Sequence, residues 1–279
     1  MQYAHLSAED KARFWEDGYL IKRRYFDDEE IGLVRRALVE DATLRANIID
    51  REEAFGTTGS EWEARDDLVQ IMWNDAGDDL FGAISRGARL VDGAELLLGG
   101  EVYNSHHVIN LKPPGGGGSF RWHQDFGYWY ENGILFPDML TAVTAIDPMR
   151  RDNGCLQLLR GSHRLGRITH ITVHGQNCAD PERVAWAQER LEIDYAEMAP
   201  GDVAFQHCNT LHCSELNTSD DPRTLLLCAY NLARNNTFRA HHFNSYTPLD
   251  KLPDSAVKER GHILNGAQRD YLRAETLEN

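Results

Sequence analysis

Residues 101–129, EVYNSHHVINLKPPGGGGSFRWHQDFGYW, carry the clearest β pattern in the chain. The stretch alternates, is interrupted by Pro113-Pro114 and four glycines, and then alternates again. Period-two alternation on both sides of a Pro/Gly break predicts two strands joined by a turn. No Lys-Ser or Lys-Thr pair follows the glycines, so they predict a hairpin turn and not a phosphate-binding loop.

Further short runs of strand character follow this pair. They are MLTAVTAIDP (139–148), GCLQLLRGSH (154–163), DVAFQHCNTLHC (202–213) and TLLLCAYNLA (224–233). Several short strands separated by turn residues indicate a β-sandwich or barrel. Residues 168–198, which include ADPERVAWAQERLEIDYAEM, interrupt the β pattern. We expect a helical insert there, and we interpret it as a candidate lid.

The residues before 99 have a helical pattern. In LSAEDKARFWEDGYLIKRRYF (6–26), Ser7 is an N-cap and Gly18 ends the helix, after which a short strand follows. The stretch DDEEIGLVRRALVEDATLRANII (27–49) predicts a longer helix, capped by Asp27 or Asp28. Residues 83–98 again indicate a helix, whereas 51–82 give no clear pattern. The tail from 250 is polar, and we expect it at the periphery.

We therefore predict a single domain spanning residues 1–279. Its helical part covers about 1–98, its mainly β core about 99–240 with the insert at 168–198, and its tail 250–279. This chain length suffices to bury a core without disulfide bonds.

Composition excludes several partners. The net charge of −15, from 44 acidic and 29 basic residues, disfavours nucleic acid and anionic membranes, which need clustered Lys and Arg. No apolar run approaches the roughly 18 residues of a membrane span, and the first residues do not resemble a secretory leader. The five cysteines form no CxxC pair. We expect a cytoplasmic protein with free thiols.

His123 and Asp125 are candidate metal ligands. On a strand, side chains two residues apart share a face, so these two would point the same way and Gln124 the other. An imidazole beside a carboxylate supplies two ligands of a 2-His-1-carboxylate triad, the site of non-haem Fe(II) oxygenases. A His-x-Asp pattern alone is unspecific, so the interpretation needs a third ligand and a co-substrate site.

Residues 200–231 offer both. His207 and His212 are each possible third ligands, and we favour His212 because Ser214 lies on its face and Arg223 begins the next strand. A guanidinium beside a hydroxyl suits one end of a dicarboxylic acid, and a metal at the other end would fit 2-oxoglutarate. Alternatively, Arg223 forms a surface ion pair with Asp220 or Asp221.

Three of these stretches together resemble the phytanoyl-CoA dioxygenase superfamily of Fe(II)/2-oxoglutarate oxygenases. They are INLKPPGGGGSFRWHQD (109–125), RDNGCLQLLRGSHR (151–164), and PGDVAF (200–205) with the His-x-Ser and Arg that follow it. The similarity spans about residues 6–235. The resemblance implies a double-stranded β-helix (jelly-roll, cupin-like) core with flanking helices. It also implies that iron is bound by His123, Asp125 and His212, and 2-oxoglutarate by Arg223 and Ser214.

Within that superfamily, residues 109–133 resemble ectoine hydroxylases. By this likeness Trp129 matches a tryptophan near the substrate, and His106 matches a pocket glutamine. FGYWYENG (126–133) lacks the acidic and hydroxyl residues that follow the iron carboxylate there, so the likeness implies the mechanism and not ectoine as the substrate.

The remaining pocket residues are expected from the strand before the glycines. His106, Val108 and Asn110 share one face of it, while His107, Ile109 and Leu111 share the other. We assign Val108 and Asn110 to the 2-oxoglutarate end of the pocket. His106, Trp129 and Phe120 are assigned to the substrate end. Ordinary core packing is the alternative for each of them.

The expected reaction is hydroxylation of an unactivated C–H bond of a small polar or zwitterionic metabolite, with decarboxylation of 2-oxoglutarate to succinate and CO₂. Desaturation or cyclisation by the same chemistry remains open, whereas Asp125 disfavours a halogenase, in which halide takes the carboxylate's place. A metal-dependent jelly-roll isomerase or hydrolase and a non-catalytic binding module are the alternatives from other classes. The arginines at 150, 151, 160, 164 and 167 are either an anion site or surface partners of the excess acids.

Overall fold

The computed structural model describes residues 5–47, 49–50, 69–74, 76–116, 118–239 and 241–272. Two antiparallel sheets form its centre. The larger sheet has the order β1-β11-β6-β13-β4-β3-β2. Its strands are β1 (Tyr19–Lys22), β2 (Ile49–Asp50), β3 (Val69–Trp73), β4 (Val102–Lys112), β6 (Met139–Ala145), β11 (Val203–His207) and β13 (Arg223–Leu232).

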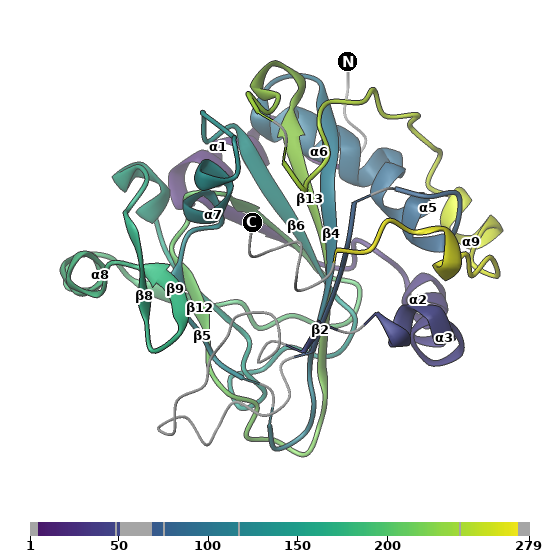
Figure 1. Cartoon of the computed structure of the whole chain (residues 1–279), viewed down its shortest axis with the longest axis horizontal. Coiled ribbons are helices and arrows are strands. Elements are labelled where there is room, and N and C mark those ends of the chain that lie inside the picture. The colour runs from purple at the N-terminus through teal and green to yellow at the C-terminus, as the bar shows by residue number, and fades with distance from the viewer. Residues whose placement is uncertain are drawn as a thin grey trace.

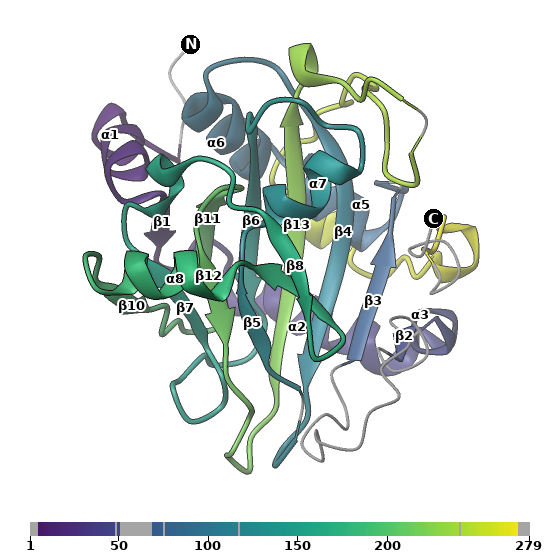
Figure 2. The same cartoon turned by 60° about the vertical axis from the view of Figure 1, so that its left-hand side comes forward.

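The smaller sheet has the order β10-β7-β12-β5, and a separate hairpin is formed by β8 and β9. The strands are β5 (Phe120–His123), β7 (Leu156–Leu159), β8 (His170–Val173), β9 (Gln176–Ala179), β10 (Ile193–Tyr195) and β12 (His212–Ser214). Figure 2 shows this sheet and the hairpin in front of the large sheet. The two facing antiparallel sheets form the predicted jelly-roll core.

Helices cover the other face of the large sheet (Figure 1). The helices described are α1 (Ala8–Asp17), α2 (Asp28–Glu40), α3 (Ala42–Ala46), α5 (Leu80–Arg86), α6 (Ala88–Leu98), α7 (Asp125–Glu131), α8 (Pro181–Gln188) and α9 (Ala256–Glu259), with 3-10 turns at Ser162–Leu165, Ala233–Asn235 and Gly266–Gln268. The main hydrophobic core lies between the helices and this sheet. For example, Phe14, Val34 and Leu90 pack in one cluster with Ile109 and Leu226.

The N-terminal helix forms where its caps predict. Ser7 and Asp10 make a capping box at the start of α1, and Gly18 ends it with φ 86°, a left-handed conformation that glycine adopts without steric cost. The longer helix predicted over 27–49 is instead two helices, because Asp41 leaves the helical conformation and its side chain caps α3 through Leu44 N. Residues 83–98 are likewise divided between α5 and α6 at Gly87.

Two further segments differ from their sequence interpretation. Residues 168–198 contain the β8–β9 hairpin and β10 as well as α8, so the insert is only partly helical. The C-terminal segment is not peripheral within its described part. Arg269 is buried and pairs with Asp41 and Asp79, which attaches the segment to the starts of α3 and α5. Residues 51–68 lie outside the described residues.

The structure bears on two composition-based expectations. All five cysteines are free and buried. Among the described residues, none of the helices is long and apolar enough to cross a bilayer.

Candidate metal centre

Strand pairing brings His123 and His212 together. The strands β5 and β12 run antiparallel with His212 directly opposite His123 and Ser214 opposite Phe120. Both histidines are buried, and their ring centroids lie 4.0 Å apart. Residues that lie about 90 positions apart in the chain are therefore neighbours because of the register of the small sheet.

Asp125 reaches the same point by a different route from the one expected. The strand β5 ends at His123, and Asp125 is the first residue of helix α7. The argument from a shared strand face was therefore wrong, although the carboxylate lies beside the two imidazoles. Asp125 Oδ1 is 3.6 Å from His212 Nε2, and Thr141 Oγ1 on β6 donates a hydrogen bond of 2.9 Å to Asp125 Oδ2.

Main-chain carbonyls orient both imidazoles. His123 Nδ1 lies 2.7 Å from Arg121 O, and His212 Nδ1 lies 3.0 Å from Thr210 O. A carbonyl only accepts, so these contacts favour the tautomer with the proton on Nδ1 and the lone pair that a metal needs on Nε2. The Gln206 amide nitrogen also lies 2.9 Å from His212 Nδ1 and 3.2 Å from its Nε2. Ligand atoms of His123, Asp125 and His212 all lie within 4.8 Å of one another. Two nitrogens and one carboxylate oxygen match the donor set of a non-haem iron site.

His207, the alternative third ligand, lies elsewhere. It is the last residue of β11, and its ring contacts Trp15 and His163 at centroid distances of 5.3 and 5.4 Å. Of the two histidines considered, only His212 lies with His123 and Asp125. In the part of the chain that the structure describes, this group is the one cluster with the spacing of a metal site.

Two buried basic side chains lie side by side near this centre. Arg223 begins β13, pairs in register with Lys112 on β4, and is 1% exposed, while Lys112 is fully buried. Arg223 Nη2 donates to Asn110 Oδ1 (3.2 Å), and Lys112 Nζ donates to Ser214 Oγ (2.8 Å). Among the described residues no carboxylate lies within salt-bridge distance of either cation, and Asp221 pairs instead with Arg150.

Among the described residues neither group is paired with a carboxylate, although Lys112 Nζ also donates to the main-chain oxygen of Glu215. Burial lowers the pKa of both groups, that of Lys112 to about 6 with a further contribution from Arg223. Arg223 Nε is buried and has no hydrogen-bond partner. Buried charges in proteins are normally paired, so this pair of cations has the chemistry of an anion-binding site. The sequence interpretation missed Lys112, because only the β4–β13 register places it opposite Arg223.

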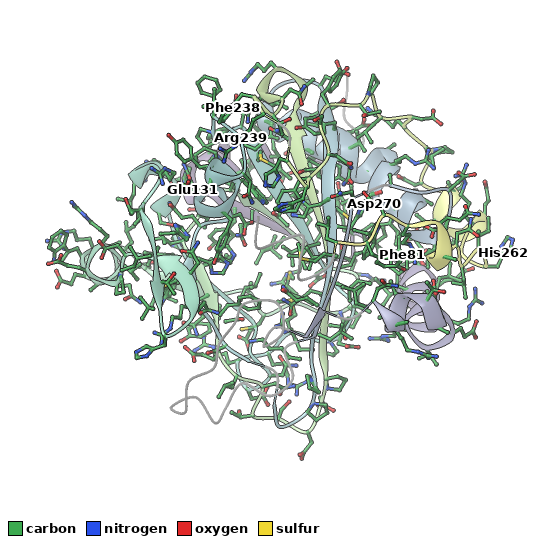
Figure 3. The ribbon with its side chains drawn as sticks, viewed as in Figure 1. Phe81, Glu131, Phe238, Arg239, His262 and Asp270 are labelled. Carbon is green, nitrogen blue, oxygen red and sulfur yellow. The ribbon has the colours of Figure 1, made fainter. Side chains whose placement is uncertain are left out.

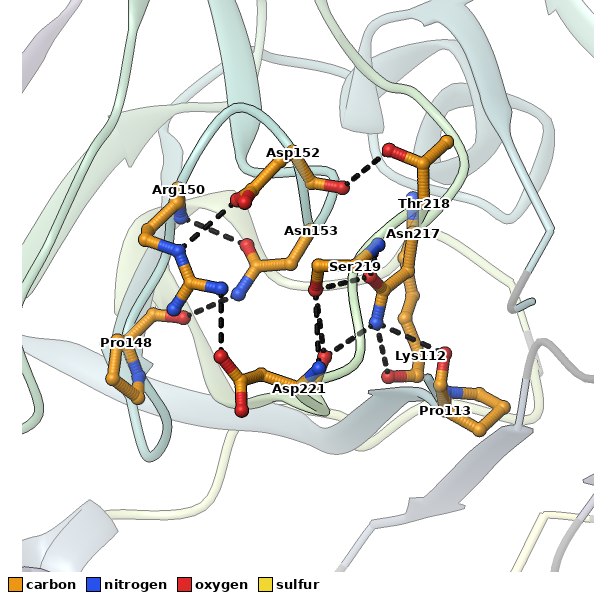
Figure 4. A network of polar contacts seen from close by, with 10 residues as sticks. All are labelled: Lys112, Pro113, Pro148, Arg150, Asp152, Asn153, Asn217, Thr218, Ser219 and Asp221. Atoms are coloured by element: carbon orange, nitrogen blue, oxygen red, sulfur yellow. Dashed lines mark hydrogen bonds and ion pairs between the residues drawn. The ribbon is translucent and has the colours of Figure 1, made fainter. Parts of the chain in front are cut away.

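A polar network fixes the ends of these two strands (Figure 4). The Asn217 side-chain amide nitrogen lies 2.9 Å from Pro113 O, 3.2 Å from Lys112 O and 2.8 Å from Asp221 O. It therefore joins the end of β4 to the residues that precede Arg223. Arg150, which binds Asp221 and Asp152, closes the outer side of this network.

All ten predicted site residues line one cavity of about 420 Å³ between the sheets. They are His106, Val108, Asn110, Phe120, His123, Asp125, Trp129, His212, Ser214 and Arg223. The two faces of β4 divide as expected, since Ile109 lies in the core and His107 stacks on Trp73 at 5.0 Å.

Aromatic rings surround His106 in the same cavity. Its imidazole stacks on Phe243 with centroids 4.0 Å apart and meets the edge of Trp129 at 5.6 Å. Burial, followed by the neighbouring histidines, lowers the pKa of His106 to about 3, so the ring is neutral at physiological pH. Phe243 was not predicted, because the segment after β13 has no strand or helix pattern.

The cavity mouth is formed partly by the end of α7. Glu131 lines the cavity, and its main-chain oxygen accepts a hydrogen bond from Arg239, whose guanidinium lies 5.7 Å from the ring of exposed Phe238. Figure 3 shows these three side chains on the same side of the molecule.

The predicted basic cluster does not form an anion site in the cavity. Four of its arginines make ion pairs with acidic residues at the surface. They are Arg150, Arg151, Arg160 and Arg167, with Asp221, Glu197, Asp194 and Glu131 as partners. Among the described residues that line the cavity, Arg223 is the single Lys or Arg side chain.

Comparisons with known proteins agree with this geometry. The family model for phytanoyl-CoA dioxygenase (PhyH) matches residues 14–225. The ectoine dioxygenase of Bordetella bronchiseptica is 30% identical over 242 residues, which cover 82% of this chain and 77% of that protein. The L-proline trans-4-hydroxylase of Streptomyces griseoviridis is 30% identical over 176 residues, which cover 57% of this chain and 65% of that enzyme.

A solved structure has the same overall fold. The crystal structure of EctD from S. alaskensis with 2-oxoglutarate and 5-hydroxyectoine superposes with a TM-score of 0.74 at 25% identity, covering 91% of each chain. With the family match over most of the chain, these similarities establish that the protein is an oxygenase of the phytanoyl-CoA dioxygenase family.

Proposed function

We propose that this oxygenase hydroxylates a C–H bond of a small polar metabolite, with Fe(II) bound by His123, Asp125 and His212. One observation carries the proposal: the three ligand atoms lie within 4.8 Å of one another in the cavity that Arg223 lines. A metal triad next to a buried cation fits a co-substrate that binds iron at one end and carries a carboxylate at the other.

The enzyme uses iron and 2-oxoglutarate. When bound, they supply the oxidising chemistry, in which O₂ is consumed, 2-oxoglutarate becomes succinate and CO₂, and one oxygen atom goes to the substrate. The protein orients the ligands: Arg121 O and Thr210 O hold the imidazoles, and Thr141 holds Asp125. Three protein ligands leave positions open for the keto acid and O₂.

We assign the far carboxylate of 2-oxoglutarate to Arg223, with Ser214 and Lys112 beside it. A guanidinium pairs a carboxylate through two parallel hydrogen bonds, and Asn110 orients it by accepting from Nη2. Lys112 would add a second positive charge once the bound diacid favours its protonated form, and its hydrogen bond to Ser214 fixes the hydroxyl next to the anion. The bound diacid would balance charges that the described protein leaves uncompensated.

We assign the substrate to the end of the cavity formed by His106, Trp129 and Phe243. Phe120 lies on β5, the strand that also carries His123. A cavity of about 420 Å³ is at the small end of ligand pockets and also has to hold the keto acid, which limits the substrate to metabolite size. Relatives named for ectoine and L-proline support a compact amino-acid derivative.

The test is O₂-dependent succinate release from protein reconstituted anaerobically with Fe(II) and 2-oxoglutarate. We expect a panel of cyclic and linear amino-acid derivatives, ectoine and L-proline included, to stimulate release, and the product to gain one oxygen atom. Loss of two hydrogens instead would indicate desaturation or cyclisation.

The Asp125→Ala variant is the control, and it should release no succinate. No release by the wild type with any member of the panel would overturn the proposal. Undiminished release by Asp125→Ala would overturn the ligand assignment. An isomerase or hydrolase would keep its activity in an Arg223→Ala variant, whereas our proposal requires severe loss.

A further inference from the structure

Gln124 stands between two of the metal ligands but faces away from the metal. It is fully buried, does not line the cavity, and occupies the break between β5 and α7. Its side-chain amide makes three hydrogen bonds to main-chain groups. Nε2 donates to Gly166 O (2.8 Å) and Asn209 O (2.7 Å), and Oε1 accepts from Ile168 N (2.7 Å).

These partners belong to the two segments that complete the site. Asn209 lies in the turn between β11 and β12, three residues before the ligand His212. Gly166 and Ile168 lead into β8 of the hairpin whose residues Gln176 and Asn177 line the cavity. One side chain therefore connects the segment of His123 and Asp125 to that of His212 and to a cavity wall.

Main-chain contacts strengthen the same junction. Gln124 N donates to His170 Nε2 (3.2 Å) on β8, and Phe126 N donates to Cys208 O (3.0 Å) in the turn before His212. The start of α7 has no side-chain cap of its own. The position of Asp125 therefore depends on contacts that Gln124 and its neighbour make with other segments.

We infer that Gln124 is a positioning residue for the iron triad, which holds Asp125 and His123 in register with His212 and docks the β8–β9 hairpin against them. The inference rests on the proposed function, since Gln124 acts only through the ligands. Without its amide, Asn209 O and Ile168 N would be buried and unpaired, and Gly166 O would lose its partner at a half-buried position, so the segments would have to move apart or admit water. Residues that orient metal ligands typically affect metal affinity about 10- to 100-fold.

The test compares Gln124→Met with a matched control, Asn235→Leu. Both substitutions replace a buried amide by an apolar side chain. Asn235 is 2% exposed, accepts from Phe136 N (3.2 Å), donates to Phe136 O (2.7 Å), and does not line the cavity. Both variants should unfold at lower temperature than the wild type, so stability alone does not separate positioning from a structural role.

Two measurements separate a positioning role from a purely structural one. They are the Fe(II) dissociation constant, measured anaerobically, and the visible charge-transfer absorption of the Fe(II)–2-oxoglutarate complex. For Gln124→Met we expect a dissociation constant about 10- to 100-fold higher and a shifted or weakened band. Its succinate production should also exceed its substrate hydroxylation. For Asn235→Leu we expect the wild-type dissociation constant and band. If Gln124→Met also keeps both, the inference is wrong.

Two further variants keep the test decisive. Gln124→Asn retains the amide, but its side chain is one carbon too short to reach all three partners. This variant should fold and bind Fe(II) with intermediate affinity. Wild-type affinity would contradict the inference. In His212→Ala, Fe(II) binding should be lost. If His212→Ala binds Fe(II) as the wild type does, both the triad and the proposed function are wrong. If His212→Ala loses Fe(II) binding but the Gln124 variants keep it, only the inference about Gln124 is wrong.

Discussion

The two ends of the cavity are built in different ways. The end with His123, His212, Arg223 and Lys112 is built on paired strands, and register places each side chain opposite its partner. The other end combines His106 on β4 with walls from α7, the β8–β9 hairpin and the segment around Phe243. Strand pairing fixes positions closely, whereas loops and short helices tolerate change. The residues assigned to iron and 2-oxoglutarate thus lie mainly on paired strands, with Asp125 at the start of α7 as the exception. We expect substrate choice to depend more on the less regular segments.

Charge separates the two ends as well. The inner end holds the buried guanidinium of Arg223 beside the buried amine of Lys112, whose pKa is lowered to about 6. An uncompensated buried charge lowers protein stability until an anion arrives. The substrate end around His106 is aromatic, and its histidine is neutral. We therefore expect substitutions at the inner end to affect 2-oxoglutarate, and those at the substrate end to affect the substrate alone.

Arg223→Leu should have the largest effect. Removing one partner of a buried charge pair costs about 2 to 5 kcal/mol, so the KM for 2-oxoglutarate should rise about 30-fold or more. Steady-state succinate formation over a range of 2-oxoglutarate concentrations measures it. Arg234→Leu removes an exposed arginine that pairs with Asp138 and should leave this KM unchanged. Equal KM values for 2-oxoglutarate in the two variants would show that Arg223 does not bind 2-oxoglutarate.

Lys112→Met should weaken 2-oxoglutarate binding less. Lys112 does not line the cavity and acts on the diacid through its charge and its hydrogen bond to Ser214. An interaction with a charged group is worth about 1.5 to 3 kcal/mol, so we expect the dissociation constant to rise about 10- to 100-fold. Anaerobic titration of the Fe(II) enzyme measures this constant. Substrate KM at saturating 2-oxoglutarate should stay the same, and a change confined to substrate KM would show that the inner end is wrongly assigned.

The pH dependence of 2-oxoglutarate binding should identify Lys112 as the titrating group. In the free protein its pKa is lowered to about 6 by burial and by Arg223, with Glu215, Cys213 and Cys155 acting in the opposite direction. A bound dianion favours the protonated amine and raises that pKa. Affinity should therefore be highest below pH 6 and fall as pH rises above it, by at most about tenfold per pH unit. Calorimetry in buffers of different ionisation enthalpy should detect proton uptake at pH 7.5 that Lys112→Met lacks.

His106→Leu should affect the other end only. The loss of one neutral hydrogen bond and an aromatic contact predicts a KM for the substrate about 5- to 10-fold higher. The KM for 2-oxoglutarate should not change. Because the pKa of His106 is about 3, its contribution to substrate KM should be constant from pH 6 to 8. A step in the wild-type profile over that range that His106→Leu abolishes would contradict a neutral ring.

Arg160→Gln should have the smallest effect. Its ion pairs with Asp194 and Glu192 are exposed, and such surface substitutions change the free energy of unfolding by less than about 0.5 kcal/mol. Neither KM should change by more than about twofold. The kinetic assays described above measure both KM values. A larger increase in substrate KM would indicate that the arginine cluster is an anion site after all.

Much of this site could be predicted from the sequence because its residues follow local patterns. The caps Ser7 and Gly18, the two faces of β4, and the choice of His212 over His207 all rest on spacing within one or two elements. Family resemblance supplied the jelly-roll fold and the ligand set.

The rest depends on contacts between distant segments. The residues after His123 are aromatic and favour a strand by propensity, but packing makes them helix α7, so Asp125 was placed on the wrong element. Lys112 lies beside Arg223 only because of the register of β4 with β13, which the sequence pattern does not reveal. Gln124 has no local pattern, since its three hydrogen bonds reach segments more than 40 residues away.

The most direct test is a crystal soaked anaerobically with Fe(II) and 2-oxoglutarate. We expect an anomalous iron peak bonded to Nε2 of His123 and His212 and to the carboxylate of Asp125, with the far carboxylate of the diacid on Arg223 and within reach of Lys112. Iron bound away from these three residues, or a diacid that leaves Arg223 without a carboxylate partner, would contradict the account.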